Sequence, residues 1–377
     1  MEGPGPMSTP DLLYSEAEED LRSAVRALLA DRAGDPGAVA RRAEAGQALD
    51  RQLWRTLAAD MGLAGLLVPE KLGGQGATHR EAAVVLEELG RAVTPVPYLT
   101  SAVMATEALL GCDTENAEVA ELLGELASGE RIGVPAVPLS AAPGGPLPAG
   151  VRAEGGSLSG RIGAVADAAD ADVLLVRADD GLYAVEVGAP GVTVEPRTPL
   201  DLTRPLADVV LDGATGRRLA DAGTAEAAIR RALLAGAGLL ASEQWGLAEW
   251  CLTETVRYLG ERRQFNRPVG SFQALKHRLA QLWLEVENAR AAARAAADAL
   301  ATDDAEIPLS VAVAQSYCAG VAVHAAEECV QLHGGIGMTW EHAAHLYLKR
   351  AKSDQIALGT PGAHRAAVAE LVDLRAP

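Results

Sequence analysis

Apolar residues recur at helical spacing near the start of the chain. They occupy one helix face between residues 21 and 29, and the pattern repeats between residues 82 and 89. The two stretches are separated by GLAGLLVPEKLGGQGAT at 62–78, whose Gly and Pro residues interrupt regular structure. This pattern predicts an N-terminal helical domain over residues 1–131.

The pattern changes in the middle of the chain and returns to helical spacing towards its end. Short runs such as ADVLLVRA and GLYAVEV lie between Gly, Pro and Asp turns and predict a small β-domain over residues 132–220. From 221 to 377 the helical period returns, with one long amphipathic helix beginning at Gln273. The order of helices, strands and helices predicts an α+β fold with a C-terminal helical bundle.

Charge and cysteine content narrow the class of protein. A net charge of −18 argues against the clustered basic face that a nucleic-acid partner needs. The four cysteines lie far apart without a Cys-x-x-Cys pair, which indicates reduced thiols and a cytoplasmic protein. The first residues lack a basic segment followed by an apolar run, so secretion is not expected. No apolar run is expected to span a membrane.

Two segments of the C-terminal domain, RRQFNRPVGSFQALKHRLA and QLHGGIGMTWEH, carry candidate binding chemistry. Their candidate residues are Arg262, Phe265, Gln273, Gln331, Gly334 and Gly335. Bare glycines let backbone N–H groups approach a pyrophosphate closely, and a nearby arginine supplies positive charge. Taken singly, each feature is also typical of ordinary helix ends, where glycine caps the helix and arginine complements its dipole.

Together, and in this order after a β-domain, the two segments resemble those of the acyl-CoA dehydrogenase family of flavoproteins. LVPEKLGGQG at 67–76 is similar to the signature of that family's N-terminal domain, so the resemblance covers nearly the whole chain. It implies a C-terminal four-helix bundle and FAD held between the subunits of a dimer or tetramer. The implied activity is α,β-dehydrogenation of an acyl-CoA or acyl-carrier-protein thioester, with electrons passed to an electron-accepting flavoprotein.

The resemblance assigns FAD contacts to residues of this chain. Arg262 would meet the pyrophosphate of the neighbouring subunit's FAD, and Phe265 would lie near its adenosine half. The same contact would be completed by Gln273, Gln331, Gly334 and Gly335. Thr360 would reach FAD from the corner between the last two helices, where it is also the expected N-cap, with Pro361 in the first helical position.

The usual catalytic base of the family is absent from that corner. Where the family typically reads Tyr-Glu-Gly-Thr, this chain reads ALGT, and Leu358 cannot accept the α-proton of a thioester. Some members place the base on the first helix of the bundle instead, and that position falls on Gly236. Glu243, two helical turns further along, is the nearest carboxylate, and its alternative role is that of a solvated or interface glutamate.

The β-domain also departs from the family pattern. VPAVPLSAAPGGPLPAG replaces the family's Thr-Glu-Pro segment, and the strand that usually backs the flavin with a tryptophan has none. Backbone N–H groups near Val165 to Ala168 would remain to bond the flavin ring. His342 and His345 lie three apart near Glu341, but no further ligand cluster accompanies them, so no metal site is expected.

Three hypotheses follow from this combination of retained and missing residues. The chain is an FAD-dependent dehydrogenase whose base has moved, with Glu243 as the candidate. Alternatively, it is a non-catalytic subunit that donates half of an FAD site to a second dehydrogenase-like chain in a heteromer. The third hypothesis is a flavin-free scaffold that keeps only the fold. Flavin content and co-purification of a second chain distinguish them.

Overall fold

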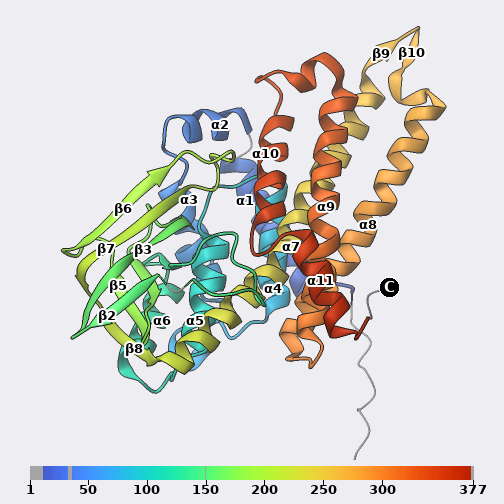
Figure 1. The fold of residues 1–377 in the computed structure, drawn as a ribbon. Coiled ribbons are helices and arrows are strands. Elements are labelled where there is room, and N and C mark those ends of the chain that lie inside the picture. Colours follow the sequence, from blue (N-terminus) through green and yellow to red (C-terminus); the bar gives the residue numbers. More distant parts are fainter. Residues whose placement is uncertain (1–11, 33–35, 149, 375–377) are drawn as a thin grey trace, which may run out of the picture.

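The computed structural model describes residues 12–32, 36–148 and 150–374 and has the predicted α+β architecture. Figure 1 shows the β-domain on one side and a bundle of long helices on the other. The helical elements before the first strand are α1 Glu16–Arg32, α2 Pro36–Glu44, α3 Arg51–Arg55, η1 Thr56–Asp60, η2 Leu63–Gly65, η3 Glu70–Leu72, α4 His79–Arg91, η4 Tyr98–Ala105, α5 Thr106–Leu110 and α6 Ala117–Ala127.

The helix α4 illustrates how local sequence fixes these elements. Thr78 accepts a hydrogen bond from Arg80 N–H at 3.2 Å, and Glu81 accepts one from Thr78 N–H at 2.9 Å. This reciprocal capping box begins the helix where the apolar period begins. The buried face of α4 then packs on α7, which places the N-terminal domain against the bundle.

The middle domain consists of two four-stranded sheets, in the orders β1-β4-β5-β8 and β2-β3-β7-β6. All pairs are antiparallel except β1 with β4. The strands are β1 Gly133–Pro135, β2 Val151–Glu154, β3 Ser157–Ala166, β4 Val173–Arg177, β5 Gly181–Glu186, β6 Val192–Arg197, β7 Leu206–Thr215 and β8 Arg217–Asp221.

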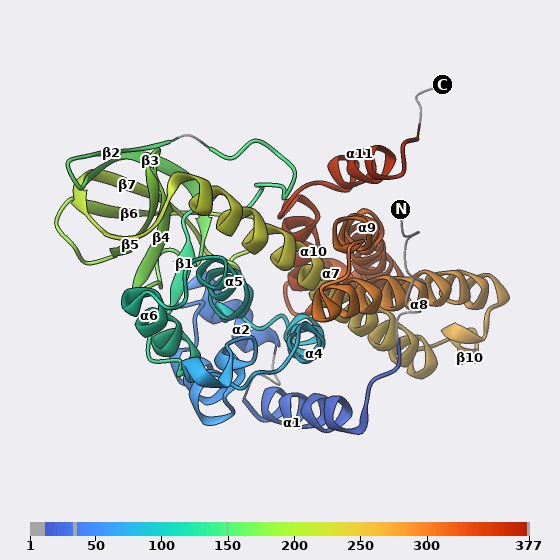
Figure 2. The ribbon, with the colours of Figure 1, turned by 90° about the horizontal axis from the view of Figure 1, so that it is seen from below.

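Long helices form the C-terminal part of the chain, and Figure 2 shows α7 running from the β-domain into their bundle. The elements are α7 Ala222–Glu261, β9 Arg263–Gln264, β10 Arg267–Pro268, η5 Val269–Ser271, α8 Gln273–Thr302, α9 Ile307–His333, η6 Gly334–Met338, α10 Ala344–Ile356 and α11 Pro361–Leu371. The predicted start of the long amphipathic helix at Gln273 is confirmed.

Two glycines allow α7 to cross α4 at very short range. A Cβ on Gly90 would lie 2.2 Å from the carbonyl oxygen of Glu243, and one on Gly246 would lie 2.0 Å from that of Glu87. Any side chain at either position would therefore force the backbones apart. This crossing fixes the middle of α7, which carries the candidate base positions, relative to the N-terminal domain.

The expectation that no apolar run is long enough to span a membrane is wrong for α9. The segment Ile307–Met338 is long and apolar enough to cross a membrane by length and composition, and 61% of its most apolar window is buried inside the protein. It packs against α7, α8, α10 and α11. A helix that is apolar on most of its faces is typical of the centre of a bundle, and α9 occupies that place here.

Candidate functional site

A hollow of about 460 Å³ brings several of the predicted FAD contacts together. Arg262 follows the last turn of α7, and Gly334 follows the last residue of α9 with a φ of +64°. Both residues line the hollow, together with Gly335. The guanidinium of Arg262 is exposed and forms no ion pair within the described residues 12–32, 36–148 and 150–374.

The two glycines leave an open cradle in this hollow. A Cβ built on Gly334 or Gly335 would meet no heavy atom within 4 Å, so the space above both backbones is free. Gln331 lies one turn earlier on α9, where it is exposed and its carbonyl accepts the Gly334 N–H. Open backbone and an adjacent arginine are the chemistry that a pyrophosphate requires, so these residues fit that group.

Phe265 and Gln273 lie beside the hollow and do not line it. Phe265 sits at the tip of the β9–β10 hairpin with a φ of +51°, followed by Asn266 at +61°. A two-residue turn with both φ values positive suits the twist of a hairpin, but it is costly for phenylalanine. The turn holds the Phe265 ring 85% exposed, and Gln273 is exposed at the first turn of α8.

Thr360 lies in a different part of the bundle from the hollow. Its hydroxyl accepts the Ala363 N–H at 3.2 Å, which confirms it as the N-cap of α11, and Pro361 opens that helix. In Figure 1, α11 and the β9–β10 hairpin lie towards opposite ends of the long helices. The predicted FAD contacts of one chain therefore form two separate groups of residues.

The two candidate base positions meet in space. A Cβ on Gly236 would lie 3.2 Å from Leu358 Cδ1 and 2.8 Å from Met104 Cγ. Leu358 and Met104 are buried, at 0% and 3% exposure, so they close this point with apolar side chains. Met104, which comes from η4, was not predicted from the sequence. None of these three residues can accept a proton.

The N–H and the carbonyl of Leu358 are both hydrogen-bonded, although the backbone conformation of this residue is unfavourable. Its φ is +54°, a region that non-glycine residues enter only when the surroundings enforce it. Its N–H donates to the Leu139 carbonyl at 2.7 Å, and its carbonyl accepts a hydrogen bond from His364 Nε2 at 2.9 Å. The Leu139 N–H donates to the Ala164 carbonyl at 2.9 Å, so the corner is linked to β3.

The segment that replaces the family's Thr-Glu-Pro pattern packs directly against this corner. A Cβ on Gly359 would lie 3.0 Å from Ala142 Cβ, and Arg230 of α7 donates to the carbonyls of Pro143 and Gly145 at 3.0 and 3.1 Å. The expectation of open N–H groups at 165–168 is wrong in part. The Asp167 N–H donates to the Pro205 carbonyl at 2.9 Å, because the chain there continues the pairing of β3 with β7.

Glu243 is buried inside the chain, so the expectation of a solvated glutamate is wrong. It is 2% exposed and accepts hydrogen bonds from Arg204 at 2.6 Å and from Arg350 at 2.5 Å. Burial by itself raises the pKa of Glu243, but the two guanidinium groups outweigh it and hold the pKa below its ordinary value. A carboxylate shared by two arginines is a weak base, because proton uptake would leave both cations without a counter-charge.

This ion-pair network joins the middle domain to the C-terminal bundle and was not predicted. Arg350 of α10 also donates to Asp201 at 2.6 Å, and both Asp201 and Arg204 belong to the loop before β7. Asp354 lies 3.5 Å from Arg204 and is fully buried. Sequence offered little signal, since the partners are up to 149 positions apart.

The grouping of His342 with His345 and Glu341 does not form. The His345 ring packs edge-on against Trp340, with the ring centroids 4.7 Å apart. The ring of His342 instead lies 4.2 Å from that of His333, the last residue of α9. All four cysteines are free and buried.

Comparison with known proteins identifies this arrangement. The sequence matches the family models described as acyl-CoA dehydrogenase N-terminal domain, over residues 15–130, and C-terminal domain, over residues 226–372. It is 38% identical over 347 residues to acyl-CoA dehydrogenase IpdE2 of Mycolicibacterium smegmatis, covering 92% of this chain and 96% of that protein. The chain belongs to the acyl-CoA dehydrogenase family.

Solved structures agree with this assignment. The crystal structure of the ChsE4–ChsE5 complex from Mycobacterium tuberculosis matches with a TM-score of 0.84 at 29% identity, over 97% of this chain and 100% of that one. A structure described as a Tcur3481–Tcur3483 steroid ACAD variant matches with a TM-score of 0.82 at 29% identity, over 95% and 98%. Acyl-CoA dehydrogenases are flavin-dependent oxidoreductases that act on the CH–CH bond of acyl-CoA thioesters.

Proposed function

We propose that this acyl-CoA dehydrogenase chain works as one subunit of a heteromer and supplies half of an FAD site to a second dehydrogenase-like chain. The second chain would carry the catalytic base and the remaining flavin contacts. One observation carries this proposal: both base positions of the family, Leu358 and Gly236, meet at a buried apolar point closed by Met104. Among the residues that the structure describes, neither of these two base positions carries a side chain that can accept a proton.

The hollow at the other end of the bundle supports the donated half-site. Arg262 would hold the pyrophosphate of the partner's FAD by charge-assisted hydrogen bonds, and Gln331 would add a polar contact. The bare backbones of Gly334 and Gly335 would let the phosphates approach closely, and Phe265 would cover the adenosine side. FAD, when bound, takes up the hydride that leaves the acyl β-carbon, and an electron-accepting flavoprotein would receive the electrons.

The corner of this chain is proposed to hold no flavin ring of its own. The Leu139 carbonyl is already bonded to the Leu358 N–H, and Ala142 packs on Gly359. Thr360 caps α11 with its hydroxyl, so an FAD contact there would have to share that group. One matched structure is described as a complex of two differently named proteins, and the description of the other joins two protein names, which supports a heteromer. The second is described as a steroid ACAD, so a steroid-type acyl-CoA is the first substrate to test.

The test is a dehydrogenase assay of the chain alone and together with its second chain. With FAD in excess, the isolated protein should turn over neither straight-chain nor steroid-type acyl-CoA, because no base lies at the corner. Adding a dehydrogenase-like chain that retains the corner glutamate should restore activity. Robust turnover by the isolated chain, lost in Glu243→Gln with flavin retained, would overturn the proposal in favour of a relocated base.

A further inference from the structure

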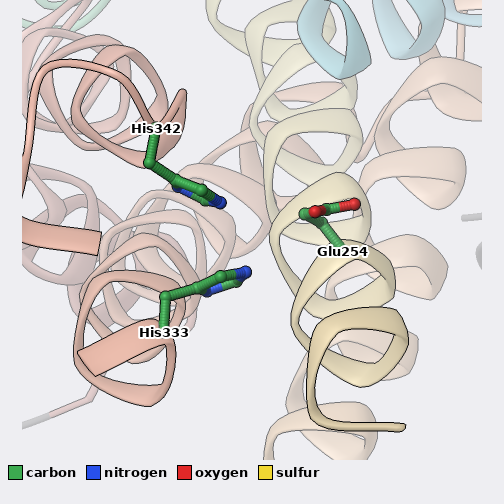
Figure 3. Close-up of side chains that lie close together, drawn as sticks. All are labelled: Glu254, His333 and His342. Carbon is green, nitrogen blue, oxygen red and sulfur yellow. The ribbon is translucent and has the colours of Figure 1, made fainter. Parts of the chain in front are cut away.

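Three side chains to which the proposed function assigns no role converge between the bundle helices. Glu254 comes from α7, His333 ends α9, and His342 lies in the turn before α10. Each offers a ligand atom, and these atoms all lie within 4.8 Å of one another. Figure 3 shows both imidazole rings reaching across the gap towards the Glu254 carboxylate.

We propose that Glu254, His333 and His342 form a binding site for a divalent transition-metal ion such as Zn²⁺. Two imidazole nitrogens and one carboxylate oxygen form a ligand set that suits zinc, whereas magnesium and calcium select oxygen ligands alone. Three protein ligands leave a fourth position for water or an outside group. The proposal is independent of the proposed function, because neither the corner nor the FAD hollow requires a metal.

His333 is prepared for this role by its surroundings. It is 2% exposed, and its Nδ1 lies 2.7 Å from the Cys329 carbonyl, which fixes the proton on Nδ1. The Nε2 lone pair is then free, and Nε2 is buried without a hydrogen-bond partner among the residues that the structure describes. A ligating histidine characteristically donates its other N–H to a backbone carbonyl, so the ring has the tautomer and orientation of a metal ligand. An unpaired buried nitrogen is otherwise costly.

His342 and Glu254 each exchange one contact when the metal binds. The Ala344 N–H reaches His342 Nδ1 at 3.2 Å, and Arg257 pairs with Glu254 at 2.6 Å. The Arg257 guanidinium holds both carboxylate oxygens of Glu254, and its side chain is 54% exposed, so the metal would replace one of two water-accessible bonds.

The position of the trio gives the metal a structural consequence. His333 immediately precedes Gly334 and also lines the FAD hollow. The hydrogen bonds of His333 and His342 go to residues outside the trio. A metal held by all three residues would thus add a direct link between α7, the end of α9 and the turn before α10. It would therefore stabilise the bundle at the base of that hollow.

The test is Zn²⁺ titration of the chelator-treated full-length chain by calorimetry, with the melting temperature followed in parallel. We expect one ion per chain and a higher melting temperature with the metal. Glu254→Gln and His342→Gln should each weaken binding by at least about tenfold, since even outer-shell changes cost ten- to a hundredfold. His345→Gln is the matched control, because that ring packs on Trp340 outside the trio and should leave the affinity unchanged.

Visible spectra of the Co²⁺-loaded chain show whether the metal is bound by the trio or by the nearby thiols. Nitrogen and oxygen ligands should give only weak visible bands. A strong sulfur-to-cobalt charge-transfer band would overturn the proposed ligand set, because it would place Cys329 or Cys251 on the metal. Failure to bind Zn²⁺, or binding that neither Glu254→Gln nor His342→Gln weakens, would overturn the site itself.

Discussion

The Leu358 N–H donates a 2.7 Å hydrogen bond to the Leu139 carbonyl, which joins the corner between α10 and α11 to the segment between β1 and β2. The Leu139 N–H continues the link to Ala164 at 2.9 Å. Backbone hydrogen bonds thus connect the bundle to the sheet at the corner where the family resemblance implies the flavin ring and the base.

Leu358→Glu should destabilise the chain and give it no dehydrogenase activity. The new carboxylate would be buried against Met104 without a partner, which costs several kcal/mol or forces it to remain protonated. Urea unfolding and an acyl-CoA assay measure both effects. Leu358→Met, which conserves volume at the same backbone angle, should cost less than about 1.5 kcal/mol. A gain of turnover in Leu358→Glu would show that flavin and thioester reach this corner.

Arg262→Ala should weaken FAD binding in the mixed assembly without unfolding this chain. A hydrogen bond to a charged group contributes about 1.5–3 kcal/mol, so the FAD dissociation constant should rise about ten- to a hundredfold. Flavin fluorescence during dilution measures the constant, and circular dichroism checks the fold. The control is Arg263→Ala in the adjacent strand β9, where the side chain is exposed but does not line the hollow. Equal FAD affinity in both variants would contradict the assignment.

Glu243→Gln should destabilise the folded chain. Without the Glu243 charge, Arg204 and Arg350 stay buried with one counter-charge fewer. Breaking such a buried pair lowers the free energy of unfolding by about 3–5 kcal/mol. Glu261→Gln on the same helix removes an exposed i,i+4 pair with Arg257 and should cost about 0.5 kcal/mol or less. Denaturant unfolding of both variants gives the comparison. Similar small effects in the two proteins would mean that the network contributes little.

Asp354 should make the stability of the chain depend on pH. Burial, followed by the negative charge of Glu243, raises the pKa of Asp354 from 3.8 to about 8. The folded chain therefore keeps a proton that the unfolded chain releases between about pH 4 and pH 8, and the contribution of Asp354 to stability falls as pH rises through that window. With Asp354 protonated, the acids Asp201 and Glu243 balance the cations Arg204 and Arg350.

Asp354→Asn isolates this effect, because asparagine has the shape of the protonated acid and does not titrate. The unfolding free energy of the variant should change less between pH 6 and pH 9 than that of the unaltered chain. Urea midpoints at matched pH values measure the difference. Parallel pH profiles for the two proteins would show that Asp354 does not hold the extra proton.

Much of the fold followed from local patterns, whereas much of the site did not. The helical period, the start at Gln273 and the N-cap at Thr360 depend on neighbouring residues, and they are confirmed. The burial of Glu243 depends on Arg204 and Arg350, which lie on other elements. Charged side chains on an Ala-rich helix give no sequence signal of such distant partners.

The interpretation of the histidines shows the same limit at shorter range. Spacing on one predicted helix grouped His342 with His345, but the chain turns before α10 and carries the His342 ring to His333. The closeness of Gly236 and Leu358 likewise appears only when α7 and the corner pack together with Met104. The missing glutamate was readable from sequence, because a motif of consecutive residues needs no tertiary information.

The ratio of FAD to protein chains tests the central claim most directly. It should be measured by flavin absorbance and quantitative amino-acid analysis on the isolated chain and on its assembly with a second dehydrogenase-like chain. If this chain donates only half of an FAD site, the isolated chain should hold no stoichiometric flavin, and the assembly should hold one FAD for each pair of unlike chains. One FAD bound per chain in the isolated protein would contradict the half-site proposal.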